Sequence, residues 1–512
     1  MSGGHVTLDI IVLHGTLKIY RMETLLRHLT CGNALVFIII LGIGGSFQNG
    51  FHVTVISSLS PYIWSFINSS WTGRYEETPP AQTVKLLWSA IVSMYAVGGL
   101  LGSMSVRCIA GRFGRKRAMI WNNVVSIVAA VIMFTSRGAN SFEMILIARF
   151  LFGFTAGLGG NIHAIYLGES SPKKIRGMVT LTYATFISIG KLSGQFFGLR
   201  EILGREDSWN ILLCVSTCFS VVQLLTLPFF PEAPRYLLIE KGNAEACKKA
   251  LQSLWGRGEY KLEMTEMVLE QASIKGETSK SLLELLRDRS VRWQLITMVV
   301  VYGCIQFSGI TAISVFSFDI FKEAGIPLDK IRYVTLGVGV SEVLTSITCG
   351  LLIESVGRRA LLWGGFGAMS TIMILITITL NLKDYSFWIP YSTVGLIFLF
   401  VIFYGGGPAG VLPSLTHEIF IQSCRPAAFV FTGILRWLGF AVLGLVFPFL
   451  IELLKSVSFV LFACMCLLAS FYIFFYLPET KGKTLLEISE EFKNITLCVN
   501  PLSDDKTLET RL

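Results

Sequence analysis

Stretches of mostly apolar residues recur along the chain, and shorter polar segments separate them. Because about 20 helical residues cross the hydrocarbon core of a bilayer, each stretch of that length predicts one membrane-spanning helix. Twelve stretches qualify, at residues 33–55, 84–106, 118–136, 142–165, 178–200, 208–230, 293–318, 330–353, 360–381, 390–413, 428–450 and 456–477. The pattern predicts an all-α membrane protein with twelve transmembrane helices.

One long polar segment divides the twelve stretches into two groups of six, and parts of it have a helical pattern. The pattern therefore predicts five consecutive parts. They are a tail at 1–32, a six-helix half at 33–230, a helical linker at 231–292, a second six-helix half at 293–477 and a tail at 478–512.

The composition agrees with a membrane protein. Of the 512 residues, 53% are hydrophobic and 15% are charged, whereas a soluble chain carries about 25% charged residues. Most of the eleven cysteines lie in apolar stretches, which indicates buried thiols rather than disulfides. The sequence has no nucleophile–base set, metal-ligand spacing or phosphate-binding loop. We therefore expect no enzyme activity, cofactor or metal.

The net charge of +9 predicts the orientation of the chain rather than a nucleic-acid partner. Basic residues gather after the second, fourth and eighth stretches, for example at Arg115, Arg176 and Arg359. Loops rich in Lys and Arg stay in the cytosol. Both termini and the linker are therefore predicted to be cytosolic, in a multi-pass protein of the plasma membrane. Asn68-Ser69-Ser70 is a glycosylation acceptor pattern in a predicted outside loop.

The two halves repeat three motifs at nearly one offset. Arg115 matches Arg358 at an offset of 243, and Glu232 matches Glu479 at 247. The third motif, Glu-x6-Arg, occurs at 169–176 and again at 418–425, an offset of 249. Two parallel six-helix halves are the architecture of major facilitator carriers.

All three motifs fall at predicted cytosolic helix ends, where Arg and Glu can form charge-assisted pairs. We interpret them as a cytosolic gate that holds the halves together; the alternative is a topology signal only. The candidate gate residues are Arg115, Glu169, Arg176, Glu232, Arg358, Arg359, Glu418, Arg425 and Glu479.

These motifs resemble those of the sugar porters, and specifically of the facilitative hexose transporters. The resemblance rests on residues 111–116, 166–172, 231–237, 357–359, 417–420, 425–428 and 478–482, which span nearly the whole chain. Residues 197–204 resemble the class II, fructose-transporting branch. The resemblance implies alternating access to one sugar site near the midplane, and a small cytosolic bundle formed by the linker.

The resemblance also implies candidate sugar contacts. Gln48, Gln195, Gln306 and Trp437 match family residues at the sugar or in the inner cavity, and each could instead serve helix packing. Thr311 and Glu342 stand where the family has asparagine.

Other positions depart from the family towards charge. Lys191 replaces an aliphatic residue, Arg436 replaces an asparagine, and His52 stands where proton-coupled relatives have aspartate. Since an unpaired charge inside a membrane protein is costly, we hypothesise that Glu342 pairs with Arg436.

The tenth stretch is interrupted by glycine and proline, at Gly405, Gly406, Gly407, Pro408 and Pro413. These residues weaken a helix, so we predict a hinge there. For Gly153 and Gly157 of the fourth stretch we favour close helix packing instead.

The predicted function is facilitated, uniport transport of a hexose such as fructose or glucose. The first alternative is proton-coupled sugar symport through His52, because histidine titrates near neutral pH. The second is a nutrient sensor that does not transport. The expected partners are a small sugar and the lipid bilayer, and the monomer is the expected functional unit.

Overall fold

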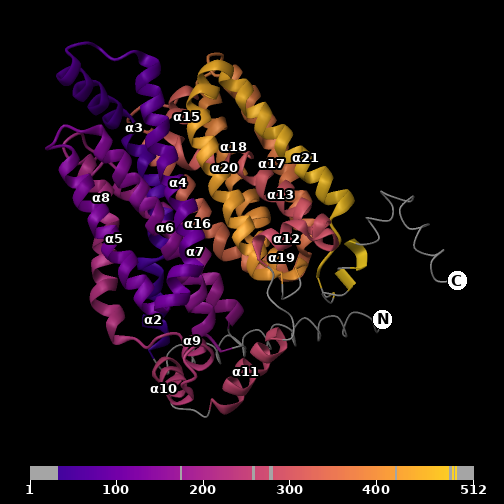
Figure 1. Cartoon of the computed structure of the whole chain (residues 1–512). Helices are drawn as coiled ribbons and strands as arrows, with labels where there is room; N and C mark the ends of the chain where they lie inside the picture. The colour runs from indigo at the N-terminus through magenta and orange to yellow at the C-terminus, as the bar shows by residue number, and fades with distance from the viewer. Residues whose placement is uncertain are drawn as a thin grey trace, which may run out of the picture.

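The computed structural model describes residues 33–172, 176–256, 260–275, 281–420, 424–481, 483, 487–488 and 490–492. Within these residues every regular element is a helix. Figure 1 shows two groups of long helices side by side, the first indigo to magenta and the second orange to yellow. Most of the two predicted tails lies outside the described residues.

The first half contains the helices of spans one to six. They are α2 (Ala34–Gly44), α3 (Ser46–Tyr75), α4 (Ala81–Phe113), α5 (Arg115–Ser136), α6 (Phe142–Ser170), α7 (Arg176–Phe197) and α8 (Trp209–Thr226). Span one is made of α2 and α3, which meet at Gly45. At 1.5 Å per residue, the 30 residues of α3 measure about 45 Å and so exceed the hydrocarbon core of ~30 Å. Asn68 is exposed near the C-terminal end of this helix.

The second half begins with three short helices in place of one. They are α13 (Arg292–Gln306), α14 (Ile310–Val315) and α15 (Ser317–Glu323). The remaining elements are α16 (Ile331–Val356), α17 (Arg358–Asn381), α18 (Ile389–Tyr404), η3 (Gly405–Ala409), α19 (Gly410–Ile419), α20 (Arg425–Leu454) and α21 (Ser458–Tyr476).

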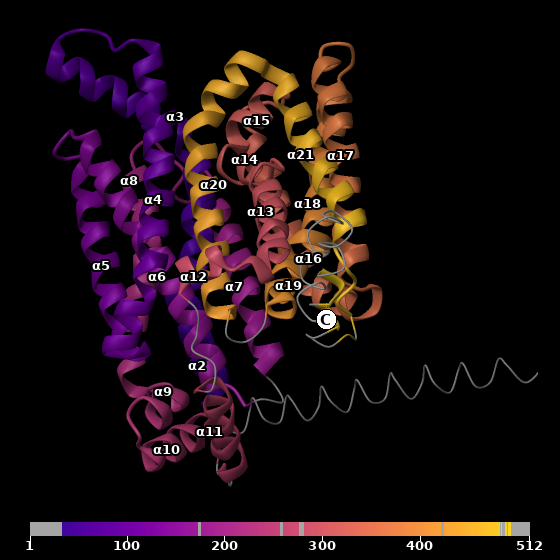
Figure 2. The ribbon, with the colours of Figure 1, turned by 45° about the vertical axis from the view of Figure 1, so that its right-hand side comes forward.

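The linker forms the short helices α9 (Pro234–Ile239), α10 (Ala244–Trp255), α11 (Lys261–Lys275) and α12 (Leu282–Arg287). Figures 1 and 2 both place α9, α10 and α11 at one end of the first half, which we call the linker end. Leu251 and Leu254 of α10 share a buried cluster with Phe37 of α2, and Trp255 Nε1 donates to Ser170 O at 2.7 Å. The linker is thus packed onto the membrane helices.

Among the described residues, nine helical stretches are long and apolar enough to cross a membrane. One of them, Ala427–Tyr476, contains both α20 and α21. The helices α7 and α16 complete the twelve predicted spans, and each carries a charged residue in its middle, Lys191 and Glu342. The prediction of twelve helices in two halves is therefore confirmed.

The glycines of span four lie against the backbone of α4. A Cβ added to Gly153 would lie 1.9 Å from Tyr95 O, and one added to Gly157 would lie 2.1 Å from Gly99 O. Neither distance leaves room for a methyl group. The packing interpretation of these glycines is confirmed, and it explains how α4 and α6 approach so closely.

Candidate functional site

The linker end carries one charged cluster in each half. In the first half, Arg115 at the start of α5 donates to Glu169 and to Glu240, both at 2.8 Å. In the second half, Arg358 at the start of α17 donates to Glu418 at 3.1 Å. The positions that match in sequence therefore form the same ion pair in space.

The matching residues Glu232 and Glu479 also have the same geometry in both halves. Glu232 accepts from the backbone N–H of Lys116 at 2.8 Å, and Glu479 accepts from the backbone N–H groups of Arg358 and Arg359 at 3.0 and 3.1 Å. A carboxylate at a helix N-terminus is stabilised by the unpaired N–H groups and the helix dipole.

Glycine is required just before these two helices. Gly114 has φ +88° and Gly357 has φ +101°, in the left-handed region that glycine adopts most readily. A Cβ would lie 2.6 Å from Glu232 Oε2 in the first half and 2.9 Å from Glu479 Oε2 in the second. The sequence repeat is thus a repeat of structure down to single hydrogen bonds.

The ion pairs Arg115–Glu169 and Arg358–Glu418 each join residues of one half, and Arg115–Glu240 joins the first half to the linker. The side chains of Arg176 and Arg425 lie outside the described residues. A gate role for the cluster residues therefore stays a prediction.

The opposite end, which we call the far end, joins the two halves. Ser57 of α3 and Ser317 of α15 have their hydroxyl oxygens 2.7 Å apart, and Ser60 donates to both oxygens of Asp319 at 3.4 Å. Arg332 of α16 donates to the Tyr62 hydroxyl at 3.0 Å. Contacts between the halves are thus concentrated at the far end and along the pairs α4–α20 and α7–α16.

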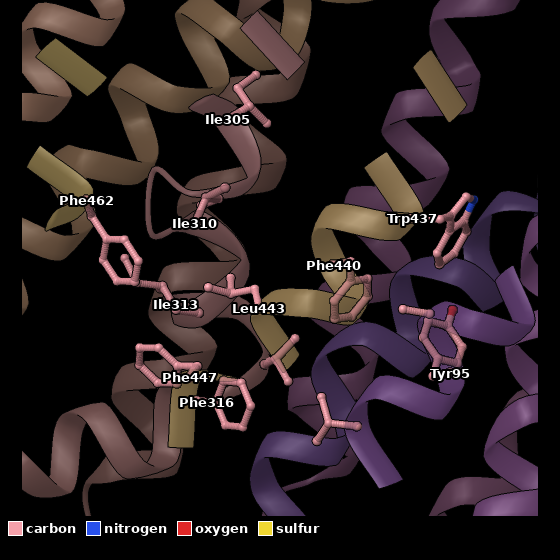
Figure 3. Packing of buried hydrophobic residues seen from close by; sticks show 14 of the residues in the cluster. Tyr95, Ile305, Ile310, Ile313, Phe316, Trp437, Phe440, Leu443, Phe447 and Phe462 are labelled. Carbon is pink, nitrogen blue, oxygen red and sulfur yellow. The ribbon is translucent and has the colours of Figure 1, made fainter. Parts of the chain in front are cut away.

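Trp437 lies between the halves. This residue of α20 is buried, and a Cβ on Gly99 of α4 would lie 2.5 Å from its indole ring. Figure 3 shows Trp437 beside Tyr95 and Phe440. Its ring centroid is 6.0 Å from that of Tyr95 and 6.3 Å from that of Phe440. The indole Nε1 is buried and has no acceptor among the described residues. A free donor beside an aromatic face fits the predicted contact with a sugar ring.

Apart from Glu342, the other predicted sugar contacts lie in three different places: Gln306 with Thr311, Gln195, and Gln48. Gln306, at the end of α13, accepts from the Thr311 hydroxyl at 3.1 Å and lies against Gly439 of α20, two residues from Trp437. Gln195 of α7 is buried, faces Gly339 of α16, and has an Oε1 without a described donor.

Gln48 is held inside the first half, where it donates to Ser220 of α8 at 2.5 Å and accepts from Ser126 of α5 at 3.5 Å. The structure therefore brings Gln306 and Thr311 together beside Gly439 of α20, places Trp437 on the side of α20 that faces α4, and places Gln48 in helix packing.

The hypothesis that Glu342 pairs with Arg436 is wrong. Glu342 of α16 instead accepts from Lys191 of α7 at 2.6 Å, and only 11% and 12% of the two side chains is exposed. The helices α7 and α16 come from different halves and pack against each other. Their charged residues lie on the two helix faces that are in contact. Arg436 lies over the Trp437 ring at 5.5 Å.

His52 and Arg149 form a second polar site, inside the first half. His52 is buried, stacks on Phe152 at 4.2 Å, and has its Nε2 2.7 Å from the Ser216 hydroxyl. Arg149 is fully buried, donates to His52 O at 3.2 Å, and lies over the Tyr95 ring at 4.5 Å. Arg149 was not among the predicted site residues, although a charged residue in a predicted span is itself a signal of function.

The backbone of span ten changes where glycine and proline were predicted to interrupt it. A π-helical turn over Gly405–Ala409 separates α18 from α19, and Pro413 lies within α19. Such turns are rare and occur often at functional sites. The irregular backbone is confirmed, whereas hinge motion stays a prediction.

Comparison with known proteins decides the family. The family model described as Sugar (and other) transporter matches residues 37–492. The chain belongs to the sugar transporter family. Human solute carrier family 2, facilitated glucose transporter member 9, is 42% identical over 449 residues, or 88% of this chain and 83% of that protein. Member 5 from Equus caballus is 40% identical over 469 residues, or 91% and 94% of the two chains. The motif resemblance is confirmed for this family of transporters.

Solved structures agree on the fold of this sugar transporter. The partially occluded inward open form of the xylose transporter XylE from E. coli matches with a TM-score of 0.72 at 19% identity, over 88% of this chain and 98% of that one. Its inward open form also matches at 0.72, over 90% and 99%. The twelve helices therefore have the major facilitator fold.

Proposed function

We propose that this sugar transporter moves a hexose such as fructose or glucose across the plasma membrane by facilitated diffusion. Relatives at 42% and 40% identity are named facilitated glucose transporters, which supports a hexose substrate. The observation that carries the proposal is the buried Trp437 between the halves, an aromatic face whose indole N–H has no acceptor among the described residues. On α13 and α14 of the second half, Gln306 and Thr311 supply neutral hydrogen-bonding groups.

The arrangement of the halves supports alternating access. The basic loops predict that the linker end and both termini are cytosolic, and the far end then faces outward. Contacts such as Ser57–Ser317 and Ser60–Asp319 close the far end, while two of the ion pairs at the linker end each stay within one half. The described conformation is then inward-facing, like the two matching xylose transporter structures, one inward open and one partially occluded inward open. One chain supplies both halves, so the monomer is the proposed functional unit.

Three short segments support a finer placement. Residues 168–172 and 341–345 resemble facilitated glucose transporter member eleven, and residues 197–204 resemble the fructose-transporting branch. Fructose is therefore the first substrate to test.

The surroundings of His52 favour uniport over proton coupling. A proton on His52 would add a second positive charge beside Arg149 in a buried site, which is costly. His52 also has no carboxylate partner among the described residues with which it could exchange a proton.

We expect the purified protein in proteoliposomes to take up labelled fructose or glucose at the same initial rate with and without an inward proton gradient. His52→Gln should keep this behaviour, because the glutamine amide reaches the position of Nε2 and can still bond Ser216. Uptake that collapses with a protonophore would identify a symporter. Absence of uptake of either sugar would favour the sensor and overturn the proposal.

A further inference from the structure

Arg436 of α20 is a positive charge without an acidic partner among the described residues. The side chain is half-buried, and the central carbon of its guanidinium lies 5.5 Å from the centre of the Trp437 ring. An arginine inside a membrane protein is costly unless it is paired, hydrated or used for function. The residues and charges around Arg436 indicate whether it is paired, hydrated or used for function.

The surroundings of Arg436 place it between the two halves. Its guanidinium lies over the Trp437 ring, and that ring packs against Gly99 and Tyr95 of α4 in the other half. The partly exposed guanidinium therefore lies beside the buried aromatic residue that we propose as a sugar contact.

The nearby charges do not neutralise Arg436. Lys191 of α7 and Glu342 of α16 also lie between the halves, but they pair with each other at 2.6 Å and so together add no net charge. Arg436 therefore keeps its positive charge beside Trp437, whose buried Nε1 has no acceptor among the described residues. Figure 3 shows this nitrogen pointing away from Tyr95.

We propose that Arg436 binds the carboxylate of an acidic sugar, and that this carrier accepts hexuronates as well as neutral hexoses. Guanidinium binds a carboxylate with two parallel N–H···O bonds, which a neutral hydroxyl cannot reproduce. The Trp437 ring would cover the apolar face of the sugar, as in the proposed hexose site. The inference rests on the proposed function, because both substrates would use one site and one transport cycle.

The test uses purified protein in proteoliposomes, with labelled glucuronate and labelled fructose or glucose measured in parallel. We expect saturable glucuronate uptake by the unmodified protein. Arg436→Met should lower the ratio of glucuronate to hexose uptake by about tenfold or more, since it removes a charge-assisted hydrogen bond. Arg436→Lys should retain a larger part of the ratio, because it keeps the charge but not the two parallel bonds.

Membrane potential gives an independent readout. A hexuronate carries one negative charge, so a potential of 100 mV, negative inside, should lower its equilibrium accumulation roughly 50-fold. Hexose accumulation should not respond. A structural role of Arg436 alone would not produce this difference.

Three results would overturn the inference. If hexose is taken up but glucuronate is neither taken up nor inhibits hexose uptake, the inference is rejected and the proposed function stays intact. An unchanged uptake ratio in Arg436→Met would show that the guanidinium does not bind the carboxylate. Absence of uptake of both sugars in a folded protein would reject the proposed function as well.

Discussion

Replacing either Lys191 or Glu342 by methionine is expected to destabilise the protein far more than replacing both. The two side chains pair at 2.6 Å between the halves and are nearly inaccessible. Removing one partner leaves a buried charge without its counter-ion, which costs about 3–5 kcal/mol. Replacing a buried pair by apolar residues of similar volume is close to neutral. Thermal unfolding in detergent, followed by size-exclusion chromatography, would measure the three variants.

The matched control is the ion pair of Arg74 and Glu143, in which 33% and 47% of the side chains is exposed. Arg74→Met should change the unfolding temperature little, because exposed ion pairs contribute little. If the double variant of Lys191 and Glu342 were as unstable as the worse single variant, the two charges would not be stabilised mainly by their pairing.

Arg115→Met is expected to have the second largest effect, because Arg115 binds two carboxylates. It donates to Glu169 of α6 and to Glu240 just after α9, and so ties a linker helix to two membrane helices. The Glu169 side chain is 16% exposed and would lose its cation, whereas Glu240 is 39% exposed and can be hydrated. Losing such a charged hydrogen bond costs about 2 kcal/mol. We expect a lower unfolding temperature and a hexose uptake rate reduced roughly tenfold per molecule at the surface.

The repeat supplies the control for this variant. Arg358→Met removes the equivalent ion pair with Glu418 in the second half. We expect it to lower the unfolding temperature and the uptake rate by a similar amount. An effect of one variant without an effect of the other would contradict equivalent roles for the clusters.

Much of the fold could be predicted from the sequence because the bilayer imposes a length and a polarity on every span. The repeat at offsets near 245 placed Arg115 and Arg358 at equivalent positions, and the structure gives them equivalent partners. Span four and span ten were distinguished correctly, since glycine alone allows close packing whereas glycine with proline also breaks the helical backbone.

The pairing inside the membrane could not be predicted, because it depends on how the helices are rotated and which neighbours they have. Glu342 lies 151 residues from Lys191 and finds it only because α7 packs on α16. Gln48 looked like a cavity residue, but its neighbours Ser126 and Ser220 lie on helices of its own half. Tyr95 was missed because its place between Arg149 and Trp437 arises only from packing.

Counterflow tests alternating access to a single hexose site most directly. Proteoliposomes are loaded with unlabelled fructose, or with glucose if that is the substrate, and diluted into trace labelled sugar without a proton gradient. We predict a transient accumulation of label above its equilibrium level, since the loaded sugar returns the inward-facing site to the outside. Label that only approaches equilibrium, at the same rate in loaded and empty vesicles, would contradict a carrier mechanism.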